Sequence, residues 1–361
     1  MCVVWWGAAF SKLGHHFTFV VPAMLSNAPL VRTKAIKTKL YRNYPEDLRP
    51  SLFGFLAAHS GTVIEFAVPV VLLFSPWPMV TLAFVALMAF FHFFITSQFP
   101  LAVPLEWNIF YMFSTLWLFY GHGAWEGFAV TDMNPLLLIP TLVVLFFFPI
   151  YGNIRPDKIS FLPAARYYAG NWAVSQWAFK KGPTKHEGAE HKINTHITTS
   201  AKTQYEQLNL LYGPEVAEIF LQQCVAWRSM HSHGRALNTL MVRHLADPNA
   251  YDIREGEFAA STILGWQFGD GHLHDERLMA EVQRRCKFEP GECIVTYIES
   301  EPFGKGTEHY RVHDLATGLI EEGNVRVSDM IATQGWLPDG PIPVQVVRAN
   351  AEPAGLAGSS Y

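Results

Sequence analysis

Residues 79–97 read MVTLAFVALMAFFHFFITS, a run of nineteen residues with no Lys, Arg, Asp or Glu. A helix needs about 20 consecutive apolar residues to cross the hydrocarbon core of a bilayer. The run therefore predicts a membrane span. Similar apolar runs flank it, and we expect four spans in all: residues 53–75, 79–97, 103–120 and 135–151.

The predicted spans lie in a segment without basic residues. Of the 27 Lys and Arg in the 361-residue chain, seven precede residue 50 and twenty follow residue 154. The 105 residues between them carry four acids: Glu65, Glu106, Glu126 and Asp132. A water-soluble fold of this size would need a charged surface, so we expect the segment to be solvated by lipid.

Composition also excludes several classes of protein. A net charge of −4 and 50% apolar residues exclude a nucleic-acid-binding protein and a disordered chain. The four cysteines form no Cys-x-x-Cys pair, which indicates reduced thiols rather than a secreted disulfide scaffold.

The positions of the basic residues predict the orientation. Loop 26–52 carries six Lys and Arg, whereas loop 121–134 carries none. Since basic loops stay on the cytoplasmic side, four crossings return the chain to the cytoplasm near Arg155. We expect a multi-pass protein of the cytoplasmic (inner) membrane whose C-terminal domain is cytoplasmic.

The N-terminal region precedes the predicted spans. Residues 1–10 (MCVVWWGAAF) read as the second half of a span, so we expect the reading frame to be truncated and relatives to have further spans upstream. Residues 13–27 are too short and polar to cross, which favours a re-entrant or interfacial segment.

Ionisable residues at membrane depth are the first candidate site residues. His59, Glu65 and His92 lie within predicted spans, where a charge costs roughly 2.5–3.5 kcal/mol on insertion scales and usually faces the bundle interior with a partner. They are either hydrogen-bonded pairs between helices or the lining of a polar-ligand pocket. Glu106 beside Trp107 fits an interfacial residue better, with ligand binding as the alternative.

Three stretches carry a resemblance to a known family. They are Trp5–Leu13 (WWGAAFSKL), His59–Phe74 (HSGTVIEFAVPVVLLF), and Phe91-His92 followed by Ser97-Gln98-Phe99. Over about residues 3–120 the chain resembles the membrane module of the vitamin K-dependent gamma-carboxylase, also called the horizontally transferred transmembrane domain. The whole chain also resembles an uncharacterised bacterial transmembrane family, a domain of unknown function.

The carboxylase resemblance places a catalytic base on Lys12 and implies a pocket for an isoprenoid, such as a quinone. A desolvated lysine can act as a base; alternatively, Lys12 extends to the interface and anchors the end of its segment. The carboxylase's large soluble region has no counterpart here, so carboxylation of protein glutamates is not implied.

The C-terminal half has ordinary soluble composition. We expect an interfacial linker over 156–190, in which 161–179 lies along the headgroups, then an α+β domain over 191–337 and a flexible tail over 338–361. The periodicity predicts four helices, the first three over 201–212, 214–230 and 235–246 and the fourth starting at 275–276, and strands over 293–299, 309–313 and 319–327. Val216, Ile219, Phe220 and Trp227 keep helical spacing, which indicates core packing.

Two His-x-His pairs are candidate metal ligands. His272 and His274 follow Asp270 in a glycine-rich loop, and His233 belongs to the other pair, His231-Ser-His233. Three N/O ligands with one open position suit a divalent ion such as zinc. Surface histidines or loop hydrogen bonds explain the same pattern.

The sequence thus predicts a polytopic α-helical membrane domain over residues 1–155 followed by a cytosolic α+β domain. Two functions stay open. One is a membrane enzyme or carrier acting on a lipid or isoprenoid quinone, with Lys12, Glu65 and His92 as candidate catalytic residues. The other is a non-catalytic membrane subunit or scaffold whose cytosolic domain docks a protein partner. No nucleic-acid partner and no specific cofactor is indicated.

Overall fold

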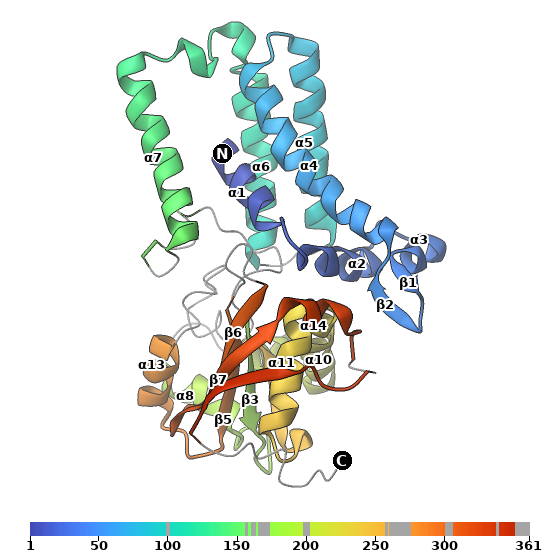
Figure 1. Cartoon of the computed structure of the whole chain (residues 1–361), viewed down its shortest axis with the longest axis vertical. Coiled ribbons are helices and arrows are strands. Elements are labelled where there is room, and N and C mark those ends of the chain that lie inside the picture. The colour runs from blue at the N-terminus through green and yellow to red at the C-terminus, as the bar shows by residue number, and fades with distance from the viewer. Residues whose placement is uncertain are drawn as a thin grey trace. The chain divides into compact units, whose positions relative to one another are not determined.

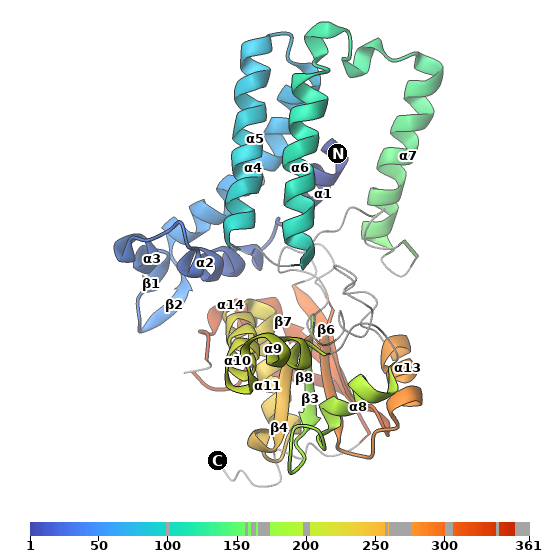
Figure 2. The ribbon, with the colours of Figure 1, turned by 180° about the vertical axis from the view of Figure 1, so that it is seen from behind.

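The computed structural model divides the chain into two compact units, Met1–Ala169 and Gly170–Tyr361, here called the helical domain and the sheet domain. It describes residues 1–98, 102–155, 158–159, 164, 174–197, 203–256, 259, 276–299, 306–336 and 339–350. Figures 1 and 2 show the chain from opposite sides.

Long antiparallel helices make up most of the helical domain (Figure 1). Among the described residues, three are long and apolar enough to cross a membrane: α4 (Leu52–Phe74), α5 (Pro78–Gln98) and α7 (Pro135–Ile154). Spans predicted over 53–75, 79–97 and 135–151 are confirmed as such helices. The fourth, over 103–120, is helix α6 (Ala102–Tyr120), which packs along α5. Helix α6 is not one of the three helices that are long and apolar enough to cross a membrane, because the polar residues Glu106 and Asn108 lower its mean hydropathy.

Short elements precede the long helices. They are α1 (Cys2–Ser11), α2 (Phe17–Asn27), α3 (Lys34–Lys39) and a hairpin of β1 (Tyr41–Asn43) and β2 (Asp47–Pro50). Helices α1 and α2 are apolar but shorter than a bilayer requires. Gly54 lets α4 lie close to the hairpin, because a Cβ at that position would come 2.5 Å from the Leu40 carbonyl oxygen.

A six-stranded antiparallel sheet, in the order β4-β3-β5-β6-β7-β8, forms the centre of the sheet domain. The strands are β3 (Val174–Lys180), β4 (Tyr251–Glu255), β5 (Cys293–Ile298), β6 (Thr307–Asp314), β7 (Gly318–Arg326) and β8 (Val344–Ala349). Its helices are α8 (Ala189–His196), α9 (Gln204–Tyr212), α10 (Pro214–Met230), α11 (Ser232–His244), α13 (Glu276–Cys286) and α14 (Val327–Ala332). The predicted α+β class, the four helices and the β5, β6 and β7 strands are confirmed.

Helices cover both faces of this sheet (Figures 1 and 2). Trp177, Phe179 and Val295 point to the face where α8 and α13 pack. Alternate residues face α11, as the hydrogen bond from Gln176 Nε2 to Asn238 Oδ1 at 2.9 Å shows. Strand β3 is therefore buried on both sides along Val174–Phe179.

The positions of β3 and β8 correct two domain boundaries. The linker expected over 156–190, with 161–179 along the headgroups, contains β3, whose aromatic residues lie in the protein core rather than at a bilayer surface. The tail expected over 338–361 contains β8, which pairs with β7 in the register Val325↔Val344. A strand covered on both faces lacks the polar alternation that marks a half-exposed strand, and a short edge strand gives little signal of its own.

The buried face of α10 differs in part from the predicted one. Val216 and Ile219 are 50% and 59% exposed, whereas Ala217 and Leu221 are buried against Tyr205 of α9. Phe220 packs against the same cluster as predicted, so the prediction is wrong for Val216 and Ile219 but not for Phe220.

The position of Trp177 gives a direct test of the β3 assignment. Its side chain is fully buried, so Trp177→Ala removes a large core side chain and should destabilise the sheet domain by about 3–5 kcal/mol. The matched change Trp336→Ala removes a side chain that is 56% exposed and should leave the melting temperature nearly unchanged. Thermal unfolding of the full chain in detergent measures both; equal, small shifts would contradict the buried strand.

Candidate functional site

Two side chains with polar end groups, Trp5 of α1 and Lys12 at the C-cap of α1, point into the helical domain. Trp5 and Lys12 are seven residues apart, which places them on one face of the chain about two helical turns, or about 10 Å, apart. Ala9, between them on that face, is fully buried. The small side chain lets α1 pack closely against α4, so Trp5 and Lys12 reach neighbouring helices rather than lipid.

Lys12 forms an ion pair with Glu65 of α4. Its Nζ donates to Glu65 Oε2, and the two side chains are only 12% and 5% exposed. The rings of Phe17 and Phe91 have their centroids 5.4 Å and 6.0 Å from Nζ, within the range of a cation–π contact. Lys12 is therefore held among side chains of the helical domain.

His92 of α5 forms a second polar group with Trp5 and Asn108. Trp5 Nε1 donates to His92 Nε2 at 2.9 Å, and His92 Nδ1 lies 2.7 Å from Asn108 Oδ1. Indole nitrogen is a donor only, so Nε2 must be the acceptor and Nδ1 carries the proton that is donated to Asn108. These two bonds hold the imidazole in one neutral tautomer.

Aromatic rings enclose this imidazole and bring it near the ion pair. The His92 ring stacks on Tyr111 with centroids 5.1 Å apart and lies 5.9 Å from the Trp5 ring, and the Trp5 and Tyr111 rings are 6.0 Å apart. Phe91, whose ring lies beside Lys12, is 5.7 Å from the His92 ring. Trp5, Lys12, Glu65, His92 and Asn108 are named the polar cluster below.

Of the five residues predicted for a membrane site, three lie in the polar cluster and two do not. His59 is one turn and a half from Glu65 on α4, and its ring nitrogens lie 3.4 Å from Thr18 and Thr62 hydroxyls. Glu106 is exposed on α6, so the α6 residue that reaches the cluster is Asn108.

Sequence reasoning missed Trp5 and Asn108. Trp5 sits in an apolar run in which a tryptophan is unremarkable, and its role depends on a residue 87 positions away. Asn108 carried a usable signal, because an amide in a predicted span is as costly to leave without a hydrogen bond as the histidine with which it pairs.

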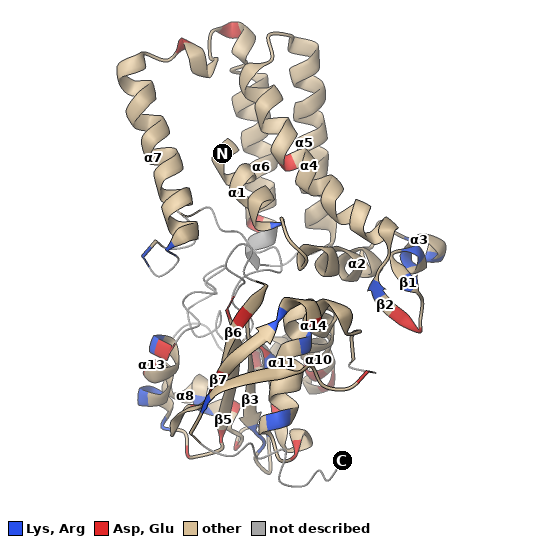
Figure 3. Ribbon diagram, in the orientation of Figure 1, with Lys and Arg blue, Asp and Glu red and all other residues tan. Residues whose placement is uncertain are grey.

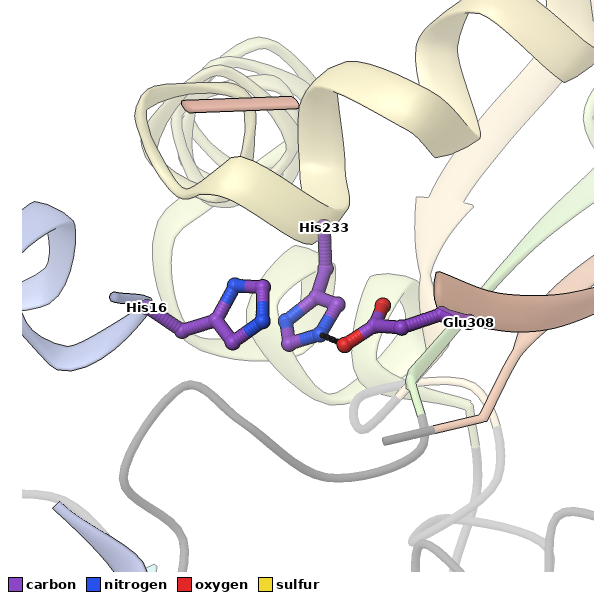
Figure 4. Close-up of side chains that lie close together, drawn as sticks. All are labelled: His16, His233 and Glu308. Atoms are coloured by element: carbon purple, nitrogen blue, oxygen red, sulfur yellow. Dashed lines mark hydrogen bonds and ion pairs between the residues drawn. The ribbon is translucent and has the colours of Figure 1, made fainter. Parts of the chain in front are cut away.

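In the sheet domain, the predicted His-x-His pair at 231–233 does not converge on one point. His233 Nε2 lies 2.8 Å from Glu308 Oε1, with both side chains fully buried (Figure 4). His231 lies 3.3 Å from Arg228 Nη1. Burial, followed by the charges of Arg228 and its neighbours, lowers the pKa of His231 well below its usual value, so this ring is neutral and accepts from the guanidinium.

The second predicted pair cannot be placed. Asp270, His272 and His274 lie outside the described residues, so the zinc site expected there stays a prediction. His233, the fourth predicted ligand, has a carboxylate partner and a buried position in the domain core.

Buried ion pairs couple strongly, which makes the Lys12–Glu65 pair testable. Removing one partner leaves the other charge unpaired and should cost about 3–5 kcal/mol, whereas removing both with apolar residues is often neutral. We expect Lys12→Met to lower the melting temperature sharply and Lys12→Met/Glu65→Leu to regain most of it. Unfolding in detergent of the two single variants and the double variant measures the coupling; additive losses would mean that the two charges do not interact.

Comparisons with known proteins give one match. Over residues 1–347 the chain matches the family described as transmembrane protein of unknown function (DUF3556). No curated protein and no solved structure matches it. The matched region contains the whole helical domain and the sheet domain up to residue 347, and the candidate spans agree with the description. The chain belongs to the DUF3556 family of transmembrane proteins.

Proposed function

We propose that the helical domain binds a hydrophobic molecule with a polar head group, a lipid or an isoprenoid quinone, at the polar cluster. The observation that carries the proposal is the buried Lys12–Glu65 pair, whose acid lies in the stretch of 105 residues, 50–154, that contains no Lys or Arg. A charged pair in such surroundings is weak evidence for stability, because desolvation offsets the attraction. Intramembrane ionisable groups are instead a mark of ligand and proton sites.

The groups in the cluster suit a ring with carbonyl oxygens. An ammonium has three N–H donors, and among the described residues Glu65 is the one hydrogen-bond acceptor of Lys12. Further donors are therefore available for the oxygens of a head group, and the adjacent Phe17 and Phe91 rings supply an aromatic contact surface. The isoprenoid tail needs only an apolar, lipid-facing surface, such as α4, α5 and α7 provide.

Chemistry at the head group would use the same residues. Glu65 can take a proton from Lys12, and the free amine is then a base beside the ligand. His92, fixed as a neutral imidazole by Trp5 and Asn108, is a hydrogen-bonding group that needs no charge at membrane depth. The resemblance of WWGAAFSKL, HSGTVIEFAVPVVLLF and the Phe91-His92 stretch to the carboxylase membrane module supports the same role for Lys12.

Lipid extraction of the purified full chain tests the proposal. We expect one isoprenoid or lipid molecule per chain by mass spectrometry, and we expect Lys12→Ala and His92→Ala to lose it. Glu106→Gln, on the exposed side of α6, is the control that should keep it.

Instability could mimic loss of the ligand, so the apolar double variant Lys12→Met/Glu65→Leu is included. If it is folded and lacks the ligand, the polar cluster is the binding site. Equal lipid content in every variant, or no co-purified lipid after extraction in mild detergent, would refute the proposal.

The second candidate function is that of a membrane subunit whose sheet domain docks a protein partner. A group of exposed apolar side chains on α9 and α10 favours it: Leu210, Leu211, Tyr212, Val216 and Ile219, each 50–73% exposed. Exposed apolar side chains that gather on adjacent helices are often part of a protein–protein interface. A ligand-free protein in the extraction experiment would support this function over the first.

We further propose that the sheet domain faces the cytoplasm and that the membrane is the cytoplasmic one. Basic residues gather on α3 and the β1–β2 hairpin before α4, and none lies along α4 to α7 (Figure 3). Basic loops favour the cytoplasmic side. Protease treatment of sealed right-side-out vesicles should leave the sheet domain intact and degrade it in inverted vesicles; the reverse pattern would overturn the orientation.

A further inference from the structure

A cluster of two histidines and one glutamate lies in the sheet domain, and its members belong to neither predicted His-x-His pair. His186 stands in the turn before α8, His191 on α8 and Glu206 on α9. Their ligand atoms all lie within 4.8 Å of one another. Glu206 Oε1 is 3.8 Å from His186 Nδ1 and 3.6 Å from His191 Nδ1.

Two side-chain hydrogen bonds fix the helices that carry this cluster. Asn194 Nδ2 donates to Thr203 Oγ1 at 3.1 Å, and the Thr203 backbone N–H donates to Asn194 Oδ1 at 2.7 Å. Thr203 is also the N-cap of α9. His191 lies three residues before Asn194 on α8, and Glu206 lies three residues after Thr203 on α9. Each is therefore about one helical turn from the hydrogen-bonded pair, on the same side of its helix, and this brings the imidazole and the carboxylate together.

Two ion pairs of α8 involve the residues on either side of His191. Arg254 of β4 forms a bidentate pair with Glu190, with both N···O distances at 2.9–3.0 Å, and Lys192 pairs with Glu292. These contacts hold α8 on the sheet and keep His191 directed at α9. A preorganised metal site needs ligand side chains whose helices are held in place by such contacts.

The turn before α8 brings His186 back to the same place. Thr184 Oγ1 donates to Glu187 Oε2 at 2.8 Å, and the Glu187 N–H donates to the Thr184 carbonyl at 3.1 Å. The rings of His186 and His191 consequently meet edge to face, with centroids 5.2 Å apart. His186 is exposed, so one side of the cluster is open to solvent.

His191 supplies an independent sign of a missing partner. Its Nδ1 is buried and has no hydrogen-bond partner, since 3.6 Å to Glu206 exceeds hydrogen-bond length. A buried nitrogen left in this way costs free energy. A cation between the three side chains would satisfy it.

We propose that His186, His191 and Glu206 bind one divalent transition-metal ion, with zinc as the first choice, and leave an open coordination position. Two histidines and a glutamate are a known zinc ligand set, with Zn–N and Zn–O bonds of about 2.0–2.2 Å. Ligand atoms around a tetrahedral ion at those bond lengths are about 3.3 Å apart, and the distances from Glu206 Oε1 to the two Nδ1 atoms, 3.6 and 3.8 Å, are close to that value. The nearby Lys185 is neutralised by Glu218 and Asp252, which removes its repulsion.

Metal titration of the full chain, purified in detergent without a histidine tag, tests the proposal. We expect one zinc per chain by elemental analysis and calorimetry. His191→Ala and Glu206→Gln should each weaken binding by more than about 10-fold, the lower end of the loss seen even for outer-shell partners. His196→Ala is the matched control, because His196 is an exposed histidine on the same helix and should not change the affinity.

Cobalt substitution separates a true site from a structural effect. Co²⁺ should give visible d–d absorption in the native chain that is lost in Glu206→Gln, while the melting temperature of the metal-free variant stays near that of the native chain. Zinc retained in both variants, or lost only in His272→Ala/His274→Ala, would place the metal elsewhere and overturn the proposal. The absence of stoichiometric zinc and cobalt binding would overturn it as well.

Discussion

Solvation by hydrocarbon is the constraint on which the helical domain depends. Between residues 50 and 154 no basic side chain is available, so the acid on α4 must find its counter-charge elsewhere in the chain. Lys12, in a separate short helix, supplies it. The same requirement explains why α1, although too short to cross a bilayer alone, packs into the helical domain. It brings an ammonium to Glu65 and an indole N–H to His92.

Much of this architecture was predictable because its signals are local. Apolar runs gave α4, α5, α6 and α7 nearly to the residue, and helix starts such as Pro214 gave the bounds of α10. Glu65 and His92 were also recognisable, since an ionisable residue in an apolar run stands out, whereas Lys12 was a candidate only through the family resemblance. The partners of Glu65 and His92 were not recognisable, because pairing between residues 53 or 87 positions apart depends on how the helices pack.

In the sheet domain, local sequence signals were not enough to predict which residues are buried. Strand β3 is covered by helices on both faces, so its sequence VSQWAFK lacks the alternation expected of a half-exposed strand and resembles an interfacial segment instead. The α10 helix has apolar residues on two sides, and only the packing of α9 decides that Ala217 and Leu221 are buried. In both cases the sequence contained the burial signal but not its direction.

For the candidate metal ligands, too, packing rather than the sequence pattern decides which side chains meet. A His-x-His pair is conspicuous in sequence, yet His231 and His233 point to separate partners, Arg228 and Glu308, because successive positions near a helix start diverge. His186, His191 and Glu206 have no recognisable spacing and still meet, because the Asn194–Thr203 hydrogen bonds set the register of α8 and α9. In this chain, polar groups are assembled by short helices that are held in place by specific contacts. The positions of α1 and α8 therefore determine which side chains meet, and motif spacing alone does not.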